Sequence, residues 1–201
     1  MMQRSLAAHT ARNYEPILEV LRDEFQGVQA VLEIGTGNGQ HATLFAAELD
    51  HLIWQTSDRN DNHETILDWL AGAGLPNVLA PLSLDVLDAS FATDTYDAVF
   101  SANTAHIMSL AAVERMFALA GQALRPGGVF CLYGPFRQNG EFNAESNASF
   151  HESLRAGDSV MGIRHLEDLD RFAATGDMQR QRLYAMPANN FIAIWRKAFK
   201  G

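Results

Sequence analysis

Short apolar runs alternate with amphipathic stretches through the first two thirds of the chain. The apolar runs predict buried β-strands, at residues 30–34, 52–56, 78–84, 96–102 and 129–133. Apolar residues at helical spacing predict helices between them, at residues 41–49, 64–71 and 111–124. Pro81 lies inside the third run, and proline cannot donate to a sheet ladder. We therefore expect that strand at an edge of the sheet.

The chain before the first strand predicts a helix preceded by an arm. Asn13 belongs to the residue types that cap helices, Glu15 and Pro16 suit a first turn, and an apolar stripe follows to Phe25. Residues 1–14 have no acid and no apolar core of a secretory signal. They predict a flexible arm, with a short mitochondrial presequence as the alternative.

The last third of the chain departs from this alternation of apolar and amphipathic stretches. A polar segment follows residue 136, and we expect residues 137–164 to be an insertion that folds as a lid over one sheet edge. A helix is predicted at 166–174, and two strands at 181–186 and 191–199, joined by Pro187-Ala188-Asn189-Asn190. Alternating strands and helices predict a parallel sheet with helices on both faces. The terminal pair has no helix between its strands and must be antiparallel.

Composition narrows the class of protein. With 201 residues, 47% of them apolar, the chain predicts one globular domain spanning 1–201. No apolar run reaches the roughly 18–20 residues of a membrane span. The net charge is −9 and no basic run occurs, so we expect no nucleic-acid partner. The single cysteine, Cys131, predicts no internal disulfide, and cytoplasm is the default location.

A glycine loop follows the first predicted strand directly. Gly35, Gly37 and Gly39 are spaced G-x-G-x-G, and a predicted helix starts after them. Glycines there permit a tight turn and close approach of the backbone to a ligand. A pyrophosphate-binding loop has the spacing G-x-G-x-x-G, and Gln40 stands where its third glycine would be. The spacing therefore argues against NAD and FAD, although a glycine loop alone is also compatible with a plain βα turn.

Acidic residues follow the next two predicted strands. Asp58 lies nineteen positions after Gly39, where a carboxylate accepts hydrogen bonds from ribose hydroxyls. Asp85 comes just after the third strand, so it lies at the same sheet edge. Phosphates would be repelled by Glu33, Asp58 and Asp85, whereas a cationic sulfonium would not. The alternatives are a solvated loop acid for Asp58, a turn residue for Asp85 and a loop-holding buried acid for Glu33.

In this order, the motifs resemble those of class I S-adenosylmethionine methyltransferases. They are Glu33-x-Gly35-x-Gly37-x-Gly39, Asp58, Asp85, Tyr96-Asp97-Ala98-Val99-Phe100 and Leu124-Arg125-Pro126-Gly127-Gly128. The resemblance implies a Rossmann-like α/β sandwich with seven strands in the order 3-2-1-4-5-7-6 and the last strand antiparallel. It also implies that Asp58 holds the ribose and Asp85 the adenine amine. The implied cofactor contacts come from Arg12, Glu33, Gly35, Thr36, Gly37, Gly39, His41, Asp58, Asp85, Val86 and Asn103.

A closer resemblance covers almost the whole chain. It is to small methyltransferase-like proteins long catalogued as a domain of unknown function, and it implies methyl transfer without fixing an acceptor. The segments that carry it are Arg12-Asn13-x-Glu15-Pro16-Ile17-Leu18, Gly39-Gln40-His41, Leu132-Tyr133-Gly134-Pro135-Phe136, Ser146-Asn147, Gly162-Ile163-Arg164 and Met186-Pro187-Ala188-Asn189-Asn190. The chain departs from the pattern at His151 and His165, near which that family leads us to expect acids.

Catalytic candidates lie just after the fourth and fifth strands. Methyl transfer is an in-line displacement that needs a well-held acceptor and sometimes a base. We expect Asn103 and His106 to face the methyl group, and His106 or Tyr133 to act as base or orienter. Tyr133, Phe136, Asn189 and Asn190 are the predicted substrate contacts, because both segments end at the same sheet edge. The alternatives are a loop histidine, a core tyrosine and a plain hairpin turn. No histidine spacing supports a metal site.

Three functions compete on this sequence. The first is S-adenosylmethionine-dependent methyl transfer to a small molecule, with S-adenosylhomocysteine as product. The second is a protein that binds the cofactor without catalysis and acts through a partner protein. The third is a nicotinamide reductase on the same fold, which the glycine spacing disfavours. The sequence leaves the oligomeric state and the acceptor open.

Overall fold

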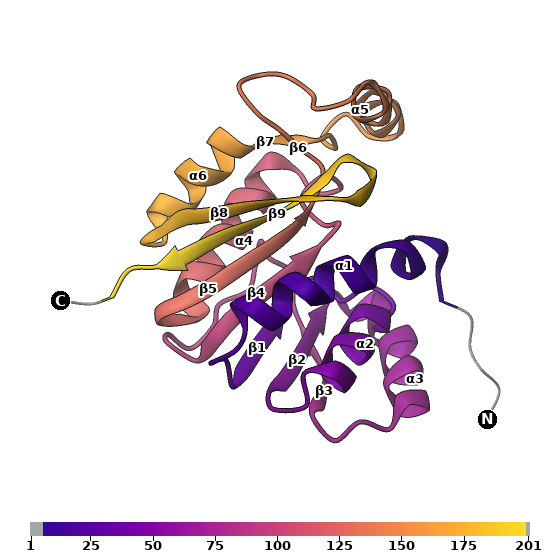
Figure 1. Ribbon diagram of the computed structural model, residues 1–201, viewed down its shortest axis with the longest axis vertical. Helices are drawn as coiled ribbons and strands as arrows, with labels where there is room; N and C mark the ends of the chain where they lie inside the picture. Colours follow the sequence, from indigo (N-terminus) through magenta and orange to yellow (C-terminus); the bar gives the residue numbers. More distant parts are fainter. Residues whose placement is uncertain (1–5, 200–201) are drawn as a thin grey trace.

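The sheet is the frame on which the rest of the chain is placed. The computed structural model describes residues 6–199, and its strands are ordered β3-β2-β1-β4-β5-β9-β8 (Figure 1). Strand β9 runs antiparallel to both its neighbours, β5 and β8, and the other pairs in this sheet are parallel. The strands are β1 (Ala30–Glu33), β2 (Ile53–Asp58), β3 (Val78–Ser83), β4 (Tyr96–Ala102), β5 (Leu124–Gly134), β8 (Met178–Met186) and β9 (Asn190–Lys197). The order implied by the methyltransferase resemblance is confirmed, with β9 as its seventh strand and β8 as its sixth.

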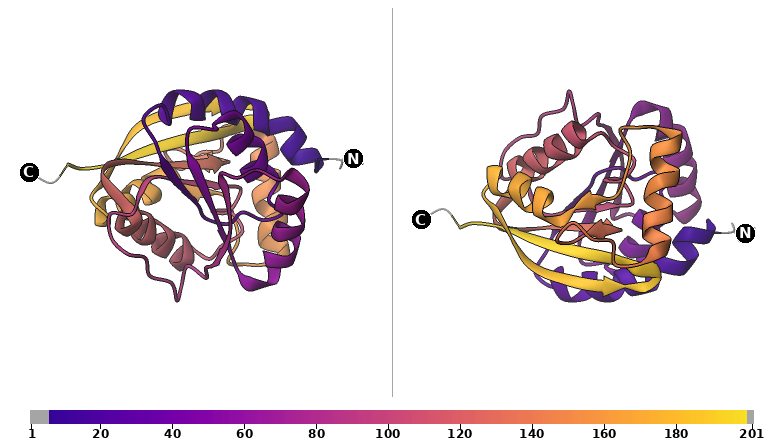
Figure 2. Two further views of the ribbon diagram at one scale, coloured as in Figure 1. Left: turned by 90° about the horizontal axis from the view of Figure 1, so that it is seen from below. Right: turned by 90° about the horizontal axis from the view of Figure 1, so that it is seen from above.

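Helices cover both faces of this sheet (Figure 2). One face carries α1 (Ala8–Glu24), α2 (Gln40–Glu48) and α3 (His63–Ala73). The opposite face carries α4 (Leu110–Ala123) and α6 (Leu166–Thr175), which pack against each other. The predicted three-layer α/β sandwich is therefore confirmed.

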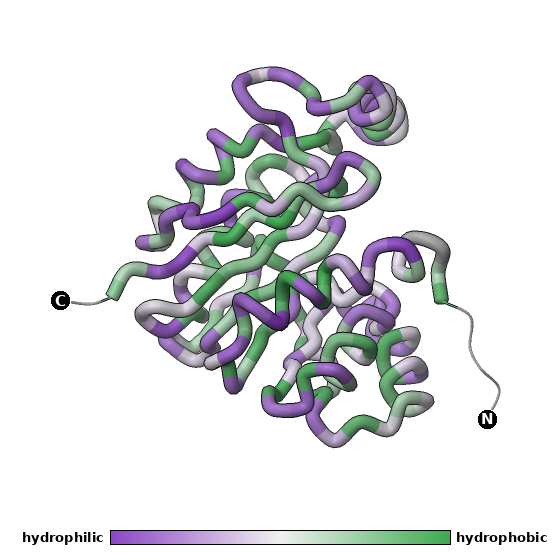
Figure 3. Tube along the Cα trace, viewed as in Figure 1, coloured by the Kyte–Doolittle hydropathy of each residue, from purple (hydrophilic) through white to green (hydrophobic). Residues whose placement is uncertain are grey.

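The alternation of strand side chains divides the core in two. Successive residues of a strand point to opposite faces, so Leu32 and Leu132 join the cluster under α4 and α6, whereas Cys131 joins the cluster under α1 and α2. The largest fully buried side chains are Trp54 and Trp195, one in each cluster. Hydrophobic residues follow the central strands, and the segment before α5 is mostly hydrophilic (Figure 3).

An insertion leaves the sheet after β5. It contains β6 (Phe136–Arg137), α5 (Glu145–Gly157) and β7 (Arg164–His165), and β6 pairs with β7 in parallel. Helix α5 lies beyond the carboxyl ends of β4 and β5 (Figure 1). We call residues 137–164 the lid, the bounds predicted from the sequence. Two short 3₁₀ turns complete the chain, η1 (Asn60–Asn62) and η2 (Pro187–Asn189).

Three predicted boundaries are wrong. Helix α1 begins at Ala8, so Asn13 lies inside it rather than capping it, and the predicted arm is helical from residue 8; residues 1–5 lie outside the described part. The backbone N–H of Ala7 donates to Gln40 Oε1 at 2.9 Å, a distant contact that holds the helix start. Strand β5 begins at Leu124 and not at residue 129, and β8 starts three residues early, at Met178.

Pro81 does lie on the edge strand β3, as predicted. Within residues 6–199, no helix is long and apolar enough to cross a bilayer.

The contact between α4 and the end of α6 depends on two glycines. A Cβ added at Gly121 would lie 2.7 Å from the Cα of Gly176 and 2.8 Å from its carbonyl oxygen. We predict that Gly121→Ala lowers the free energy of unfolding by about 1–3 kcal/mol, because backbone must move to admit the methyl group. Urea unfolding followed by circular dichroism measures this. Gly157→Ala, which meets open space at the end of α5, is the control, and equal stability of both variants would contradict the prediction.

Candidate functional site

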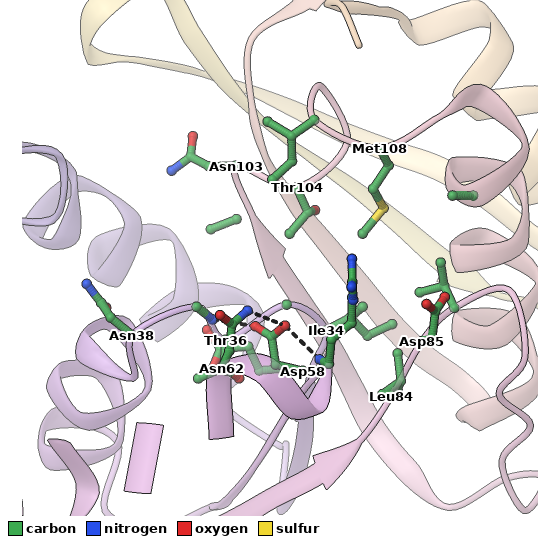
Figure 4. Close-up of a pocket in the computed structure, with 18 of the residues that line it drawn as sticks. Ile34, Thr36, Asn38, Asp58, Asn62, Leu84, Asp85, Asn103, Thr104 and Met108 are labelled. Atoms are coloured by element: carbon green, nitrogen blue, oxygen red, sulfur yellow. Dashed lines mark hydrogen bonds between the residues drawn. The ribbon is translucent and has the colours of Figure 1, made fainter. Parts of the chain in front are cut away.

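The carboxyl ends of β1 to β4 enclose a cavity of about 620 Å³, called the first cavity below. Such a crevice is where open α/β sheets bind ligands. Asn103 and Thr104 lie across it from Asp58 and Asn62, and Asp85 lies at its far side (Figure 4). Its walls are Glu33, Ile34, Gly35, Thr36, Gly37, Asn38, His41, Asp58, Arg59, Asn62, Leu84, Asp85, Val86, Leu87, Ala102, Asn103, Thr104, Ile107, Met108, Ser109 and Ala112.

The glycine loop is held from the end of β2. The N–H groups of Gly35 and Thr36 both donate to the carbonyl of Ser57 at 3.0 Å, and that of Gly37 donates to Asp58 Oδ2 at 2.7 Å. Gly37 has φ +67°, and a Cβ there would meet open space. The backbone is therefore bare where the loop borders the cavity, which permits close approach of a ligand.

The two carboxylates of the cavity differ in their surroundings. Asp58 is buried, and its Oδ1 accepts hydrogen bonds from Arg59 N at 2.7 Å and Asn62 Nδ2 at 2.8 Å. Since a carboxylate offers about four acceptor positions, Oδ2 keeps room for one more donor. Asp85 is exposed at the rim, and its Oδ1 accepts from Leu87 N at 3.0 Å. Within residues 6–199 its other oxygen accepts no hydrogen bond and is available to a ligand.

Glu33 lies beneath the loop as a buried acid. One of its oxygens, Oε2, accepts hydrogen bonds from Thr36 Oγ1 at 2.9 Å and Trp54 Nε1 at 3.0 Å. Burial raises the pKa of Glu33 to about 7, against the lowering effect of these two donors. The nearby Asp58 carboxylate raises it further. A cation in the first cavity would favour the ionised form of Glu33.

A second cavity of about 560 Å³ adjoins the first. It is bounded by α1, the loop after β4, the end of β5 and η2, and it is lined by Arg12, Asn13, Asn103, His106, Tyr133, Pro187, Ala188 and Asn190. Asn103 lines both cavities. Its φ is +60°, and its N–H donates to the carbonyl of Tyr133 at 2.9 Å. The end of β5 therefore fixes the residue at the junction.

A side-chain network runs between the two cavities. His41, in the wall of the first, shares a 2.8 Å hydrogen bond from its Nε2 with Asn13 Oδ1. Burial raises the pKa of Tyr133, whereas side-chain hydrogen bonds with Asn13 and Asn190, and the charge of Arg12, act to lower it. Asn13 thus joins a residue of the first cavity to the phenol of the second.

His106 is the buried imidazole of the second cavity. Burial, with the charge of Arg164, lowers the pKa of His106 to about 4, so the ring is neutral at pH 7. Phe150 of the lid packs edge-on against the ring, with centroids 5.4 Å apart. The backbone carbonyl of His106 accepts a hydrogen bond from Gly162 N at 2.9 Å.

Two sets of contacts hold the lid against its neighbours. The guanidinium of Arg164 donates to the carbonyls of Ala105 at 2.9 Å and Met108, in the loop after β4. On the other side, the carbonyl of Asn189 accepts from Asn143 Nδ2 at 3.0 Å and Asn147 Nδ2 at 2.9 Å. The lid is therefore tied to both the β4 loop and the β8–β9 connection.

Most sequence-predicted site residues come together in the two cavities. The first holds Glu33, Gly35, Thr36, Gly37, His41, Asp58, Asp85, Val86 and Asn103, and the second holds Arg12, Asn103, His106, Tyr133 and Asn190. Arg12 lines the second cavity, whereas most of the other predicted cofactor residues line the first. The segments at 133–136 and 187–190 are neighbours as predicted, since Gly134 pairs with Phe191.

Three predicted residues lie elsewhere. Gly39 packs against α3, where a Cβ would be 3.2 Å from Leu70 Cδ1. Phe136 is 1% exposed and belongs to the core under α4 and α6, since β6 turns its ring away from Tyr133. Asn189 directs its amide to Ser146 Oγ at 3.2 Å. None of these three residues lines either cavity, and their ligand contacts stay predictions.

Several residues in the walls of the two cavities were not predicted from the sequence. Met108 carried no predicted role and Asn13 was interpreted as a helix cap, yet Met108 lines the first cavity and Asn13 the second. The position of Met108 shortly after Asn103, on the loop leaving β4, was a usable signal. For Asn13 there was none, because its partner His41 is 28 positions away. Among residues 6–199, no group of three or more His, Cys, Asp or Glu side chains is arranged to hold a metal ion.

The sequence model of a family described as "Protein of unknown function (DUF938)" matches residues 4–197.

The fold is also similar to solved methyltransferase structures. One is the S-adenosylmethionine-dependent methyltransferase SibL, with a TM-score of 0.75 and 19% identity over 95% of this chain and 56% of that one. Another is an O-methyltransferase family protein from Burkholderia thailandensis, with a TM-score of 0.79 and 11% identity over 93% and 57%. Mitomycin 7-O-methyltransferase MmcR gives 0.78 and 18% over 92% and 54%. The chain spans little more than half the length of these proteins, and the likeness shows the shared fold.

The raised pKa of Glu33 predicts that the free energy of unfolding of the unliganded protein falls as the pH rises. Between pH 4.5 and about 7 the folded state retains a proton that the unfolded state has lost, so stability falls as pH rises through this window. We predict that Glu33→Gln removes up to about 3 kcal/mol of this loss, because the amide oxygen still accepts both hydrogen bonds. Urea unfolding at pH 4.5 and pH 7.5 measures the difference. The exposed Glu64→Gln controls for the lost charge, and parallel profiles for wild type and Glu33→Gln would contradict the prediction.

Proposed function

The chain belongs to the DUF938 family, and we propose that it is an enzyme that transfers the methyl group of S-adenosylmethionine to a small-molecule acceptor. The observation that carries the proposal is a glycine loop whose amides are already bonded, set among three carboxylates at the carboxyl edge of a methyltransferase-like sheet.

The loop suits a cationic nucleoside better than a pyrophosphate. Anions bind at helix starts through free N–H groups, but here those of Gly35, Thr36 and Gly37 are taken by β2. That of Gln40 donates to Asn38 Oδ1 at 3.1 Å. Glu33, Asp58 and Asp85 add negative charge to the same walls. These features support a sulfonium ligand and disfavour a nicotinamide dinucleotide.

The first cavity offers a place for each part of the cofactor. Asp58, with one acceptor position left, would bind the ribose hydroxyls, and the available oxygen of Asp85 would accept from the adenine amine. Leu84, Val86 and Met108 supply apolar surface beside Asp85 for the base. The bare backbone at Gly37 leaves room for the methionine part.

The second cavity would hold the acceptor, with Asn103 at the junction. A lone pair of the acceptor attacks the methyl carbon as the bond to sulfur breaks, which leaves S-adenosylhomocysteine and releases a proton from a protic acceptor. This displacement needs close alignment. Neutral His106 presents a ring that can accept a hydrogen bond or that proton, and Tyr133 orients the acceptor. The tied lid limits access of water.

The alternative is a cofactor-binding protein without catalysis. The second cavity favours the enzyme, because a binder has no use for a polar chamber beside the cofactor that contains His106, Tyr133 and Asn103. The 560 Å³ volume suits a small molecule. We further propose that the chain acts as one domain, with residues 137–164 as its lid.

Cofactor binding tests the first half of the proposal. We predict that Asp58→Ala weakens S-adenosylmethionine binding at least about tenfold, since a charge-assisted hydrogen bond contributes about 1.5–3 kcal/mol. Asp58→Asn, which keeps an acceptor for Gly37 N, should lose less. Isothermal titration calorimetry gives the affinities, and circular dichroism confirms folding. Asp61→Ala changes a neighbouring exposed acid paired with Arg59 and should bind like the wild type. Unchanged affinity in folded Asp58→Ala would refute the placement.

Methyl transfer tests the second half. Incubation with methyl-labelled cofactor and a metabolite panel should label an acceptor, and His106→Ala should lower its turnover far more than cofactor affinity. The reason is that His106 lines the second cavity only. His51→Ala, whose imidazole bonds to the carbonyl of Phe25, is the control. No labelled product despite tight cofactor binding would favour the non-catalytic alternative, and equal losses of turnover and affinity would remove His106 from the reaction.

A further inference from the structure

We propose that the acceptor carries a carboxylate and that Arg12 binds it in the second cavity. The inference rests on the proposed function, because it assigns the methyl acceptor to that cavity. It concerns the chemical class of the acceptor, which neither the fold nor the family supplies.

The charges around the second cavity have one sign. Arg12 is the single ionised side chain among its wall residues, and no acid lines it. The other polar groups are the amides of Asn13, Asn103 and Asn190, the phenol of Tyr133 and the imidazole of His106. His106 is neutral at pH 7 because burial lowers its pKa. In a chain of net charge −9, a chamber with one cation and no anion selects against amines.

Arg12 is available to a ligand. Within residues 6–199 it enters no ion pair, whereas Arg22 on the same helix bonds to Glu48 at 2.6 Å and Arg182 bonds to the buried carboxylate of Glu24 at 3.1 Å. Its side chain is exposed and borders the cavity. A guanidinium presents two parallel N–H groups that match a carboxylate. A single cation also balances a monoanion better than the double charge of a phosphate monoester.

The neighbouring amides suit the same ligand. Asn13 already accepts a hydrogen bond from His41 through its Oδ1, which leaves its N–H groups directed to the Tyr133 side. Asn190 approaches the same phenol from the start of β9. A carboxylate at Arg12 would therefore have neutral donors close by, while Asn103 lies at the side that adjoins the first cavity. The acceptor would be held at one end by Arg12 and present its reacting atom at the other.

The test uses matched carboxylates and amides. Benzoate, phenylacetate and 4-hydroxybenzoate, each paired with its primary carboxamide, are titrated by calorimetry into protein saturated with S-adenosylhomocysteine. We expect at least one acid to bind, with its amide at least about tenfold weaker, and Arg12→Gln to lose the same factor. Arg12→Lys should retain part of the affinity. Arg22→Gln removes a cation from the same helix outside the cavity and should change nothing.

The outcomes separate this inference from the proposed function. If no acid binds, or if acids and amides bind alike, the carboxylate assignment is overturned while cofactor binding stands. If Arg12→Gln weakens S-adenosylhomocysteine as much as it weakens the acids, Arg12 holds the carboxylate of the cofactor instead, and the inference also fails. If wild-type protein binds no S-adenosylhomocysteine, the proposed function fails, and the same titration without it still measures the preference of the cavity.

Discussion

The end of β2 controls the geometry of the glycine loop and so of the first cavity. Three consecutive amides of the glycine loop, at residues 35–37, donate to the backbone of Ser57 and the side chain of Asp58. The loop is therefore shaped before any ligand arrives, and the bare surface at Gly37 is fixed in place. The same bonds remove those N–H groups from competition for anions. Preorganisation of this kind reduces the conformational entropy that the loop loses when a ligand binds.

The other half of the site is assembled from distant parts of the chain. Asn103 takes its position from Tyr133, and the loop after it takes its position from Arg164 of the lid. The lid is held in turn by the carbonyl of Asn189. These contacts join the ends of β4, β5 and β8, so the second cavity depends on tertiary structure throughout. The first cavity is built from consecutive β–loop–α units and is far more local.

This contrast explains what the sequence could predict. Strand alternation and the glycine loop predicted the sheet and the acids Asp58 and Asp85, because these signals are local, whereas the strand order came from the resemblance to methyltransferases. The sequence did not reveal that α1 begins at Ala8 or that Asn13 bonds to His41, since both depend on α2. Phe136 was assigned to the substrate because it follows β5, but its ring belongs to the hydrophobic cluster on the face opposite that of Tyr133. Strand ends could be predicted from local patterns, whereas contacts between distant segments could not.

The buried thiol of Cys131 gives the molecule an internal reporter. It is fully buried in β5 between β4 and β9, where burial raises its pKa well above the usual range, and it is the single cysteine of the chain. A thiol-reactive reagent can reach it only when the central strands separate, so the labelling rate follows the equilibrium between closed and open sheet. Any molecule that binds the folded chain slows that labelling in proportion to its occupancy. Ligands of either cavity can thus be ranked by the labelling rate of Cys131, without knowing what reaction they undergo.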